Sequence, residues 1–199
     1  LAAAARFTAT AYDANGNLVD GAALSWASEN ENVASVDGTG LVTAVGPGST
    51  RIRASAGETS AWAEVVVRQQ VSRVEIAPDA HTFTSLGEEK RFTARALDAN
   101  GHPIEGAQFT WATGNGSVVR VDGTGLALAA GVGSTLLTAT SSGVSGQATI
   151  VVQQAVARVT VTPDVHRFMG IGGTAAFEAV AYDGNDHPIL GAAFTGTSR

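Results

Sequence analysis

The sequence of 199 residues contains no cysteine, only 6% aromatic residues and only 15% charged residues. The absence of cysteine excludes disulfides, thiolate zinc sites and cysteine nucleophiles, although it does not fix the cellular compartment. No apolar run exceeds five residues, as in Leu126–Ala130, so we expect no membrane span in this segment. The 12 basic side chains are scattered and are outnumbered by 18 acidic ones, which argues against nucleic acid as a partner.

What the sequence does contain is a repeat at a fixed offset of 85 residues. The run VDGTGL at 36–41 occurs again at 121–126, and aligning residues 1–70 with 86–155 gives 33 identities without a gap. Such self-similarity is the signature of tandem copies of one folding unit. We therefore predict three repeats: residues 1–70, which lack their first strand; residues 71–154, which are complete; and residues 155–199, the N-terminal half of a third.

Within one repeat, apolar and polar residues alternate with a period of two. Phe92, Ala94 and Ala96 alternate with polar neighbours, and turn-forming runs of Gly, Asp, Asn and Ser separate the alternating stretches. This pattern predicts short strands and no helix, arranged as a β-sandwich. The predicted strands lie near 71–77, 80–85, 88–98, 107–113, 117–121, 125–130, 134–141 and 144–153.

The predicted core lies between two antiparallel sheets. Its principal members are the two tryptophans at equivalent positions, together with two phenylalanines and an isoleucine of the complete repeat: Trp26, Trp111, Phe92, Phe109 and Ile150. We expect further core positions at Val74, Ile76, Ala94, Val121, Leu126, Leu137, Ala139 and Val152.

The order of these signals resembles the bacterial immunoglobulin-like domain of group 2. The resemblance rests on Val74-x-Ile76-x-Pro78, Leu86-Gly87-Glu88, Trp111, the run VDGTGL, Gly133-Ser134-Thr135 and the apolar end at 148–152. The DANGN loop at 13–17 is similar to the group 1 domains of invasin- and intimin-type adhesins. Gly196 stands where the third copy should have the tryptophan, so that copy departs from the pattern.

The resemblance implies tandem modules at a bacterial cell surface or outside the cell. Such modules occur in adhesins, in surface-layer proteins, as accessory domains of secreted glycan enzymes and in phage virions. None of these roles is enzymatic for the module itself, and none requires a cofactor. The fold class that follows is all-β, with tandem immunoglobulin-like sandwiches.

The loop that begins at Asp13 has two interpretations. Asp13, Asn15, Asn17 and Asp20 place oxygen-bearing side chains in the pattern of a calcium loop. However, no bidentate Glu follows, and the second copy has His102 and Glu105 in place of Asn17 and Asp20. We favour a hairpin turn, in which Asn-Gly supplies the positive φ angles and Asp accepts backbone hydrogen bonds.

No set of residues in this sequence predicts catalysis. The aspartates recur at equivalent loops, as a structural role requires, and the four histidines form no metal-binding spacing. Glycines fall in turns rather than between a strand and a helix, so a nucleotide site is not expected. We predict a protein without enzymatic activity, resident metal or cofactor.

A few apolar residues are candidates for an interface. Trp62 has Gln147 as its counterpart and lies close to a repeat boundary, so we expect it to pack on a neighbouring module or, alternatively, to contact a ligand. The joins at 68–73 and 153–158 contain neither Gly nor Pro and are too short for flexible tethers. The sequence therefore favours a semi-rigid, extracellular stalk or filament segment with a structural or adhesive role. The alternatives are an accessory module, for glycan or calcium, of a secreted enzyme and a virion or sheath component.

The missing first strand of the first repeat predicts a head-to-tail association. A sandwich without that strand exposes an unpaired edge, and the third repeat carries the corresponding segment. Its apolar residues Val156, Val159, Val161 and Phe168 could add to the edge of a second molecule. The alternative is that the strand lies upstream in a longer protein.

Overall fold

The fold of residues 3–197 is described from a computed structural model. These residues form strands and turns, and they contain no helix, so none that could cross a membrane. Two compact units are present: Leu1–Gln70 with Asp98–His102, and Val71–Leu97 with Pro103–Arg199. The predicted all-β class is confirmed, whereas the division into three repeats stays a prediction, because the compact units do not follow the repeat boundaries.

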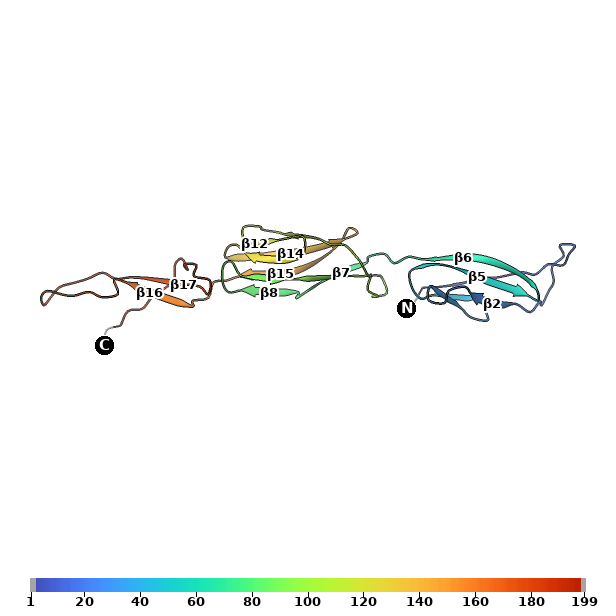
Figure 1. The fold of residues 1–199 in the computed structure, drawn as a ribbon, viewed down its shortest axis with the longest axis horizontal. Coiled ribbons are helices and arrows are strands. Elements are labelled where there is room, and N and C mark those ends of the chain that lie inside the picture. Colours follow the sequence, from blue (N-terminus) through green and yellow to red (C-terminus); the bar gives the residue numbers. More distant parts are fainter. Residues whose placement is uncertain (1–2, 198–199) are drawn as a thin grey trace. The chain divides into compact units, whose positions relative to one another are not determined.

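The first unit contains two three-stranded sheets (Figure 1). One sheet has the order β1-β4-β3, and the other has the order β2-β5-β6. The core between them contains buried Ala34, Val42 and Ile52, against which Trp26 packs. The strands are β1 (Ala4–Arg6), β2 (Ser25–Ser28), β3 (Ala34–Val36), β4 (Leu41–Ala44), β5 (Gly48–Ala56) and β6 (Thr59–Val67).

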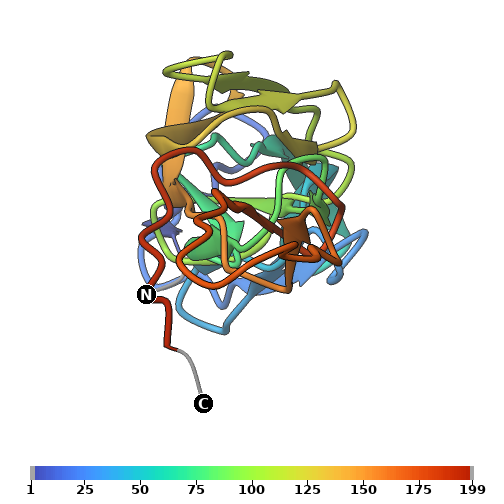
Figure 2. The ribbon, with the colours of Figure 1, turned by 90° about the vertical axis from the view of Figure 1, so that its left-hand side faces the viewer.

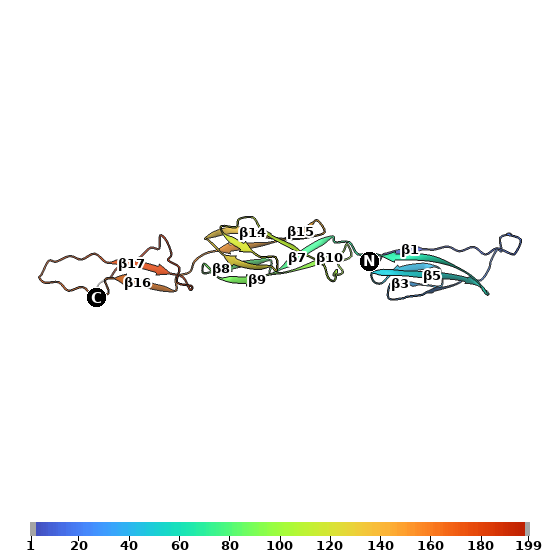
Figure 3. The same ribbon diagram turned by 45° about the horizontal axis from the view of Figure 1, so that its top comes forward.

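The middle repeat, in the second unit, has a four-stranded sheet β11-β14-β15-β8, a three-stranded sheet β12-β13-β9 and the pair β10-β7. Figure 3 shows β7 and β10 side by side. Strand β8 pairs with β15 in parallel, whereas the other pairs are antiparallel. The strands are β7 (Arg73–Ala77), β8 (Ala80–Phe83), β9 (Glu89–Arg91), β10 (Thr93–Leu97), β11 (Thr110–Thr113), β12 (Val119–Val121), β13 (Leu126–Ala129), β14 (Gly133–Ser141) and β15 (Val144–Val152).

The period-two pattern places the expected residues in the core of the middle repeat. In β14 and β15, Leu137, Ala139, Ile150 and Val152 are buried, while their neighbours along the strands are more exposed. Phe92 is also buried. Val74 and Ile76 are buried as well. Ala94, Phe109, Trp111 and Val121 pack against this cluster but are only partly buried, and Leu126 is also only partly buried, which corrects the expectation for these five residues. The prediction omitted Phe83, which is fully buried.

The single strand predicted over 88–98 is in fact two strands. Residue Phe92 separates them, because its backbone N–H donates to the carbonyl of Gly125, 2.8 Å away, outside the regular ladders. Strand β9 then pairs with β13, and β10 pairs with β7. The chain therefore switches from one sheet to the other at Phe92, and alternation alone does not mark such a switch.

Residues 155–199, the predicted third repeat, contribute one antiparallel pair, β16 (Arg158–Thr162) with β17 (Glu178–Tyr182). Figure 2 views this part of the chain, in orange and red, where irregular segments surround the pair. Val159, Val161 and Phe168 are exposed there, although their counterparts Val74, Ile76 and Phe83 are buried in the middle repeat. The same kinds of side chain are therefore buried in the middle repeat and exposed at the equivalent positions of the third.

Candidate functional site: the aspartate loops

Three loops, each beginning with an aspartate, share one hydrogen-bonded geometry. They are residues 13–17, 98–102 and 183–187, and we call them the aspartate loops. In each, the backbone N–H groups two and four residues after the aspartate donate to its Oδ1 at 2.8–3.0 Å. The aspartate side chain therefore closes its own turn, as the hairpin-turn interpretation predicts.

The second carboxylate oxygen of Asp183 bonds outside its own loop. Asp183 Oδ2 accepts hydrogen bonds from the backbone N–H of Leu86 and from Nε2 of Gln154, both at 2.9 Å. Asp183 is only 1% exposed, so its charge is balanced by these donors rather than by water. One carboxylate thus joins the third repeat, the linker and the middle repeat, and we call this arrangement the latch.

Two further hydrogen bonds support the latch of the second unit. The backbone N–H of Gly184 donates to Oγ of Ser85 at 3.1 Å. The side-chain amide of Asn185 donates to the carbonyl of Leu86 at 2.8 Å. Because the latch contacts both backbone groups of Leu86, it fixes the orientation of that turn as well as its position.

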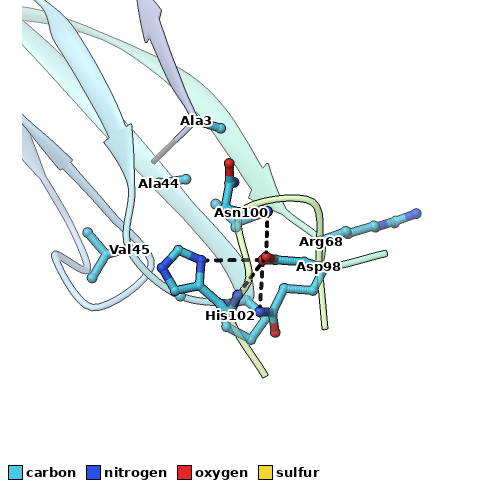
Figure 4. A pocket seen from close by; sticks show the side chains of 11 residues that line it. Ala3, Ala44, Val45, Arg68, Asp98, Asn100 and His102 are labelled. Carbon is cyan, nitrogen blue, oxygen red and sulfur yellow. Dashed lines mark hydrogen bonds and ion pairs between the residues drawn. The ribbon is translucent and has the colours of Figure 1, made fainter. Parts of the chain in front are cut away.

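The first unit contains a corresponding contact (Figure 4). Nε2 of Gln69 donates to Oδ2 of Asp98 at 3.2 Å, and Gln69 lies 85 residues before Gln154. The loop borders a pocket of about 210 Å³, whose lining includes Ala3, Ala44 and His102. The counterpart of Leu86 in this copy is Leu1, which lies outside the described residues.

The hydrogen bonds decide the electrostatics of the latch. Burial by itself would raise the pKa of Asp183, but the donors Gln154, Leu86, His187 and Asn185 outweigh it and hold the pKa well below its usual value. The pKa of Asp98 is also lowered, mainly by the backbone N–H of His102. Both carboxylates are consequently charged at neutral pH.

We expect acid to open the latch. A carboxylate with a lowered folded-state pKa stabilises the fold above its ordinary pKa of 3.8, and this contribution is lost as the pH falls below that value. The protection of the Leu86 amide against hydrogen exchange should therefore fall between about pH 4 and pH 2, relative to the β15 amides. In Asp183→Asn, which retains the Oδ1 acceptor but replaces Oδ2 by a donor, this amide should be unprotected at neutral pH.

Asp186→Asn is the matched control for this prediction. Asp186 lies in the same loop but is exposed and pairs with Arg158 at 2.7 Å, within the third repeat. This variant should retain the acid dependence of the parent. If the Leu86 amide is protected equally in Asp183→Asn and in the parent, the latch does not contribute to the stability of the fold.

The calcium candidates lie on an exposed loop. Oδ2 of Asp13 accepts a hydrogen bond from Nδ2 of Asn17 at 3.1 Å, so an amide already contacts this oxygen. Asn15, Asn17 and Asp20 are all exposed. No group of three or more acidic, histidine or cysteine side chains in the described part of the chain is arranged to hold a metal ion.

We therefore expect divalent ions to change the stability of the chain little. Thermal melting with excess calcium and then with a chelator should give midpoints that agree within about 2 °C, because a ligand raises the midpoint only if it binds the folded state. A larger, saturable shift that disappears in Asp13→Asn would establish the calcium interpretation instead.

The interface candidates are exposed side chains. Trp62 on β6 is 47% exposed, and the guanidinium carbons of Arg51 and Arg53 lie 5.2 and 5.7 Å from its ring centre. The other interface candidates are also exposed, namely Val156, Val159, Val161 and Phe168. Gln69 and Gln154, which lie at the joins, are functional residues that the sequence did not predict. Their recurrence in two copies at an offset of 85 was the available signal.

Comparison with known families identifies the domain type. Residues 70–152 match the profile of the bacterial Ig-like domain (group 2), and residues 11–58 match that of the intimin immunoglobulin-like domain. The chain contains a group 2 bacterial Ig-like domain. In this Ig-like domain, Leu86 and Ser85 belong to the turn that the latch holds, and Asp183 follows in the next repeat.

Relatives of the chain include ice-binding protein 1 of Shewanella frigidimarina (strain NCIMB 400). The two are 29% identical over 161 residues, which is 79% of this chain and 18% of that protein. Among solved structures, surface layer protein SbsC (domains 1–6) is 20% identical, with a TM-score of 0.42, over 92% of this chain and 26% of that one. Invasin, a bacterial integrin-binding protein, is 18% identical, with a TM-score of 0.46, over 92% of this chain and 43% of that one. The chain thus spans less than half the length of each.

Proposed function

We propose that this chain is a segment of a non-enzymatic stalk or filament, with a structural or adhesive role, on the surface of a bacterium or outside the cell. The observation that carries the proposal is the buried carboxylate of Asp183 in the third repeat. It accepts hydrogen bonds from Leu86 of the middle repeat and from Gln154 at the join between the two. A module that only had to be tethered would need no such contact, since a flexible linker suffices. A structure that projects or connects other parts requires joins of fixed geometry.

Spin labels on the second unit test this proposal. Because the chain has no cysteine, Arg120→Cys and Arg167→Cys introduce two unique labelling sites, in the middle and third repeats. Electron–electron distance measurements should give one narrow distribution, and Asp183→Asn should broaden it. A broad distribution in the parent would contradict a stiff array and favour tethered modules.

A second candidate function, an accessory module of a secreted enzyme that binds glycan, is favoured by the exposed Trp62. An exposed indole ring can stack on a sugar ring, and the two adjacent arginines could bind its polar groups. Trp62→Gln introduces the residue that the middle repeat has at this position. If the parent binds glycans and Trp62→Gln does not, the accessory module is favoured over the stalk. A catalytic domain in the flanking sequence of the same gene would also favour the accessory module. A number of copies of the protein that is fixed by a larger assembly would instead indicate a virion or sheath component.

Strand donation between molecules is the partner interaction that we propose for a polypeptide of these 199 residues. The first unit has a groove of about 420 Å³ between β1 and the end of β6, lined in part by Phe7, Val65 and Val67. In the middle repeat, the counterpart of this part of β6 is residues 149–152 of β15, which pair with β8. The third repeat carries the counterpart of β8, with Phe168 in place of the buried Phe83.

We expect this polypeptide to form head-to-tail oligomers whose mass rises with concentration in light scattering. Truncation after Gln154 should abolish them, because it removes the donated strand. Phe168→Ala should weaken them by removing the side chain that fills the groove. Met169→Ala, the matched control, should not, since the counterpart of Met169 is the exposed Thr84. A monomeric parent, or oligomers that survive the truncation, would contradict strand donation.

A further inference from the structure

The three aspartate loops use Oδ1 in the same way but differ at Oδ2. Oδ2 of Asp183 accepts from Gln154 and Leu86, and Oδ2 of Asp98 accepts from Gln69. Oδ2 of Asp13 accepts from the side chain of Asn17, within its own loop. The exposure of the aspartate follows the same order, since Asp183 is buried, Asp98 is half-buried and Asp13 is exposed. The loop geometry is thus complete in all three copies, whereas the contact with a neighbouring segment is present in two.

The fifth residue of the loop accounts for the difference at Oδ2. His102 and His187 occupy this position in the second and third loops. Nδ1 of His102 lies 3.6 Å from Oδ2 of Asp98, beyond hydrogen-bond distance, and Nδ1 of His187 faces Oδ1 rather than Oδ2 of Asp183, at 3.5 Å. Asn17 occupies it in the first loop, and its carboxamide is the same chemical group as that of Gln69 or Gln154. In the first loop, therefore, a local carboxamide contacts the oxygen that a linker carboxamide contacts in the other two.

We infer that the loop at 13–17 is a docking surface for the end of another Ig-like repeat. The partner that it fits presents a glutamine carboxamide from a join such as Gln154, together with the backbone N–H of a turn such as Ser85–Leu86. Docking transfers Oδ2 of Asp13 from Asn17 to these two donors and buries the carboxylate. Hydrogen bonds from two donors to a charged oxygen are stronger than one local bond, which favours the exchange.

The inference rests on the proposed function, because it concerns how consecutive repeats join. It adds which atoms of the first repeat receive a partner and which residues the partner must carry. It also assigns to Asn17 the role of covering the carboxylate while no partner is bound. The calcium interpretation of the same loop requires Oδ2 to bind a cation, so the two hypotheses compete for one atom.

The test is a fused polypeptide in which residues 71–170 precede Leu1. This fusion continues the 85-residue offset and therefore supplies a complete repeat, its join and the first strand of the next copy. Asp13 and Asn17 give NMR signals that no other loop duplicates. In the fusion, the titration midpoint of the Asp13 carboxyl carbon should fall by about one pH unit relative to the parent, which corresponds to a tenfold change in proton affinity. The side-chain amide of Asn17 should lose its hydrogen-bonded chemical shift.

Two adjacent glutamines of the added repeat provide a matched pair of variants. Gln154→Ala in the added copy should return both signals to their values in the parent. Gln153→Ala should leave them as in the fusion, because Gln153 is exposed and precedes the latch residue. Hydrogen exchange of the added β15 amides verifies that each variant is folded.

Identical Asp13 titration in the fusion and the parent would overturn the inference, as would equal effects of Gln153→Ala and Gln154→Ala. The failure of the proposed function has a different signature. A broad distance distribution between labels in the middle and third repeats would contradict the stiff array without reporting on Asp13. A docked Asp13 loop with a broad distance distribution would therefore contradict the proposed function alone. A narrow distribution with an undocked Asp13 loop would contradict the docking inference alone.

Discussion

Phe83→Ala should lower the free energy of unfolding of the second unit by about 3–5 kcal/mol. The Phe83 side chain is 0% exposed and lies between the sheets, with the ring of His81 at a centroid distance of 4.7 Å. Removing it deletes apolar contacts and leaves a cavity that the surrounding strands can only partly close. Hydrogen exchange of the β14 and β15 amides measures this loss of unfolding free energy in the middle repeat.

Phe168→Ala is the matched control for Phe83→Ala, since the two phenylalanines occupy equivalent positions 85 residues apart. Phe168 is 52% exposed, so in dilute solution its replacement should cost less than about 0.5 kcal/mol. Equal costs at the two positions would mean that the third repeat has a core of its own. That result would contradict the description of its apolar residues as uncovered.

Gly125→Ala should be destabilising by about 2–6 kcal/mol, for two reasons that add. Gly125 has a φ of +81°, where a side chain is strained by about 1–3 kcal/mol. A Cβ there would also lie 2.6 Å from the carbonyl oxygen of Phe92 and 2.9 Å from the ring of Trp111. These atoms belong to the packed core, so relieving the overlap costs about 1–3 kcal/mol more.

Two other glycines separate these two effects. Gly143 has a φ of +82°, but a Cβ at this position would meet no atom of a non-adjacent residue within 4 Å, so Gly143→Ala should show the backbone strain alone. Gly123 has neither a positive φ nor a close neighbour, and Gly123→Ala should be nearly neutral. Urea unfolding, with hydrogen exchange of β14 to assign the transition, should rank the losses in this order. A cost for Gly125→Ala no greater than that for Gly143→Ala would contradict the close packing of Trp111.

The local structure of this chain follows from the sequence because it depends on neighbouring residues. Alternation of apolar and polar residues predicts the first and last residues of β14 and β15 to within one residue, because one face of each strand is buried. The turn after Asp122 is equally local: its carboxylate accepts hydrogen bonds from Thr124 and Leu126, at positions that the run VDGTGL specifies. The same holds for the Oδ1 contacts of the aspartate loops.

Only the tertiary structure decides which identical residues are buried and which oxygens find a partner. Phe83 and Phe168 have similar local sequences, but one has strands packed over it and the other does not. Asp13 and Asp183 begin loops of the same geometry, yet Oδ2 of Asp183 alone bonds to Leu86, which lies 97 residues away along the chain. The switch between sheets at Phe92 is of the same kind, because it depends on the carbonyl of Gly125. A residue's own neighbours determine its conformation, whereas its burial and long-range hydrogen bonds depend on segments that the folded chain brings beside it.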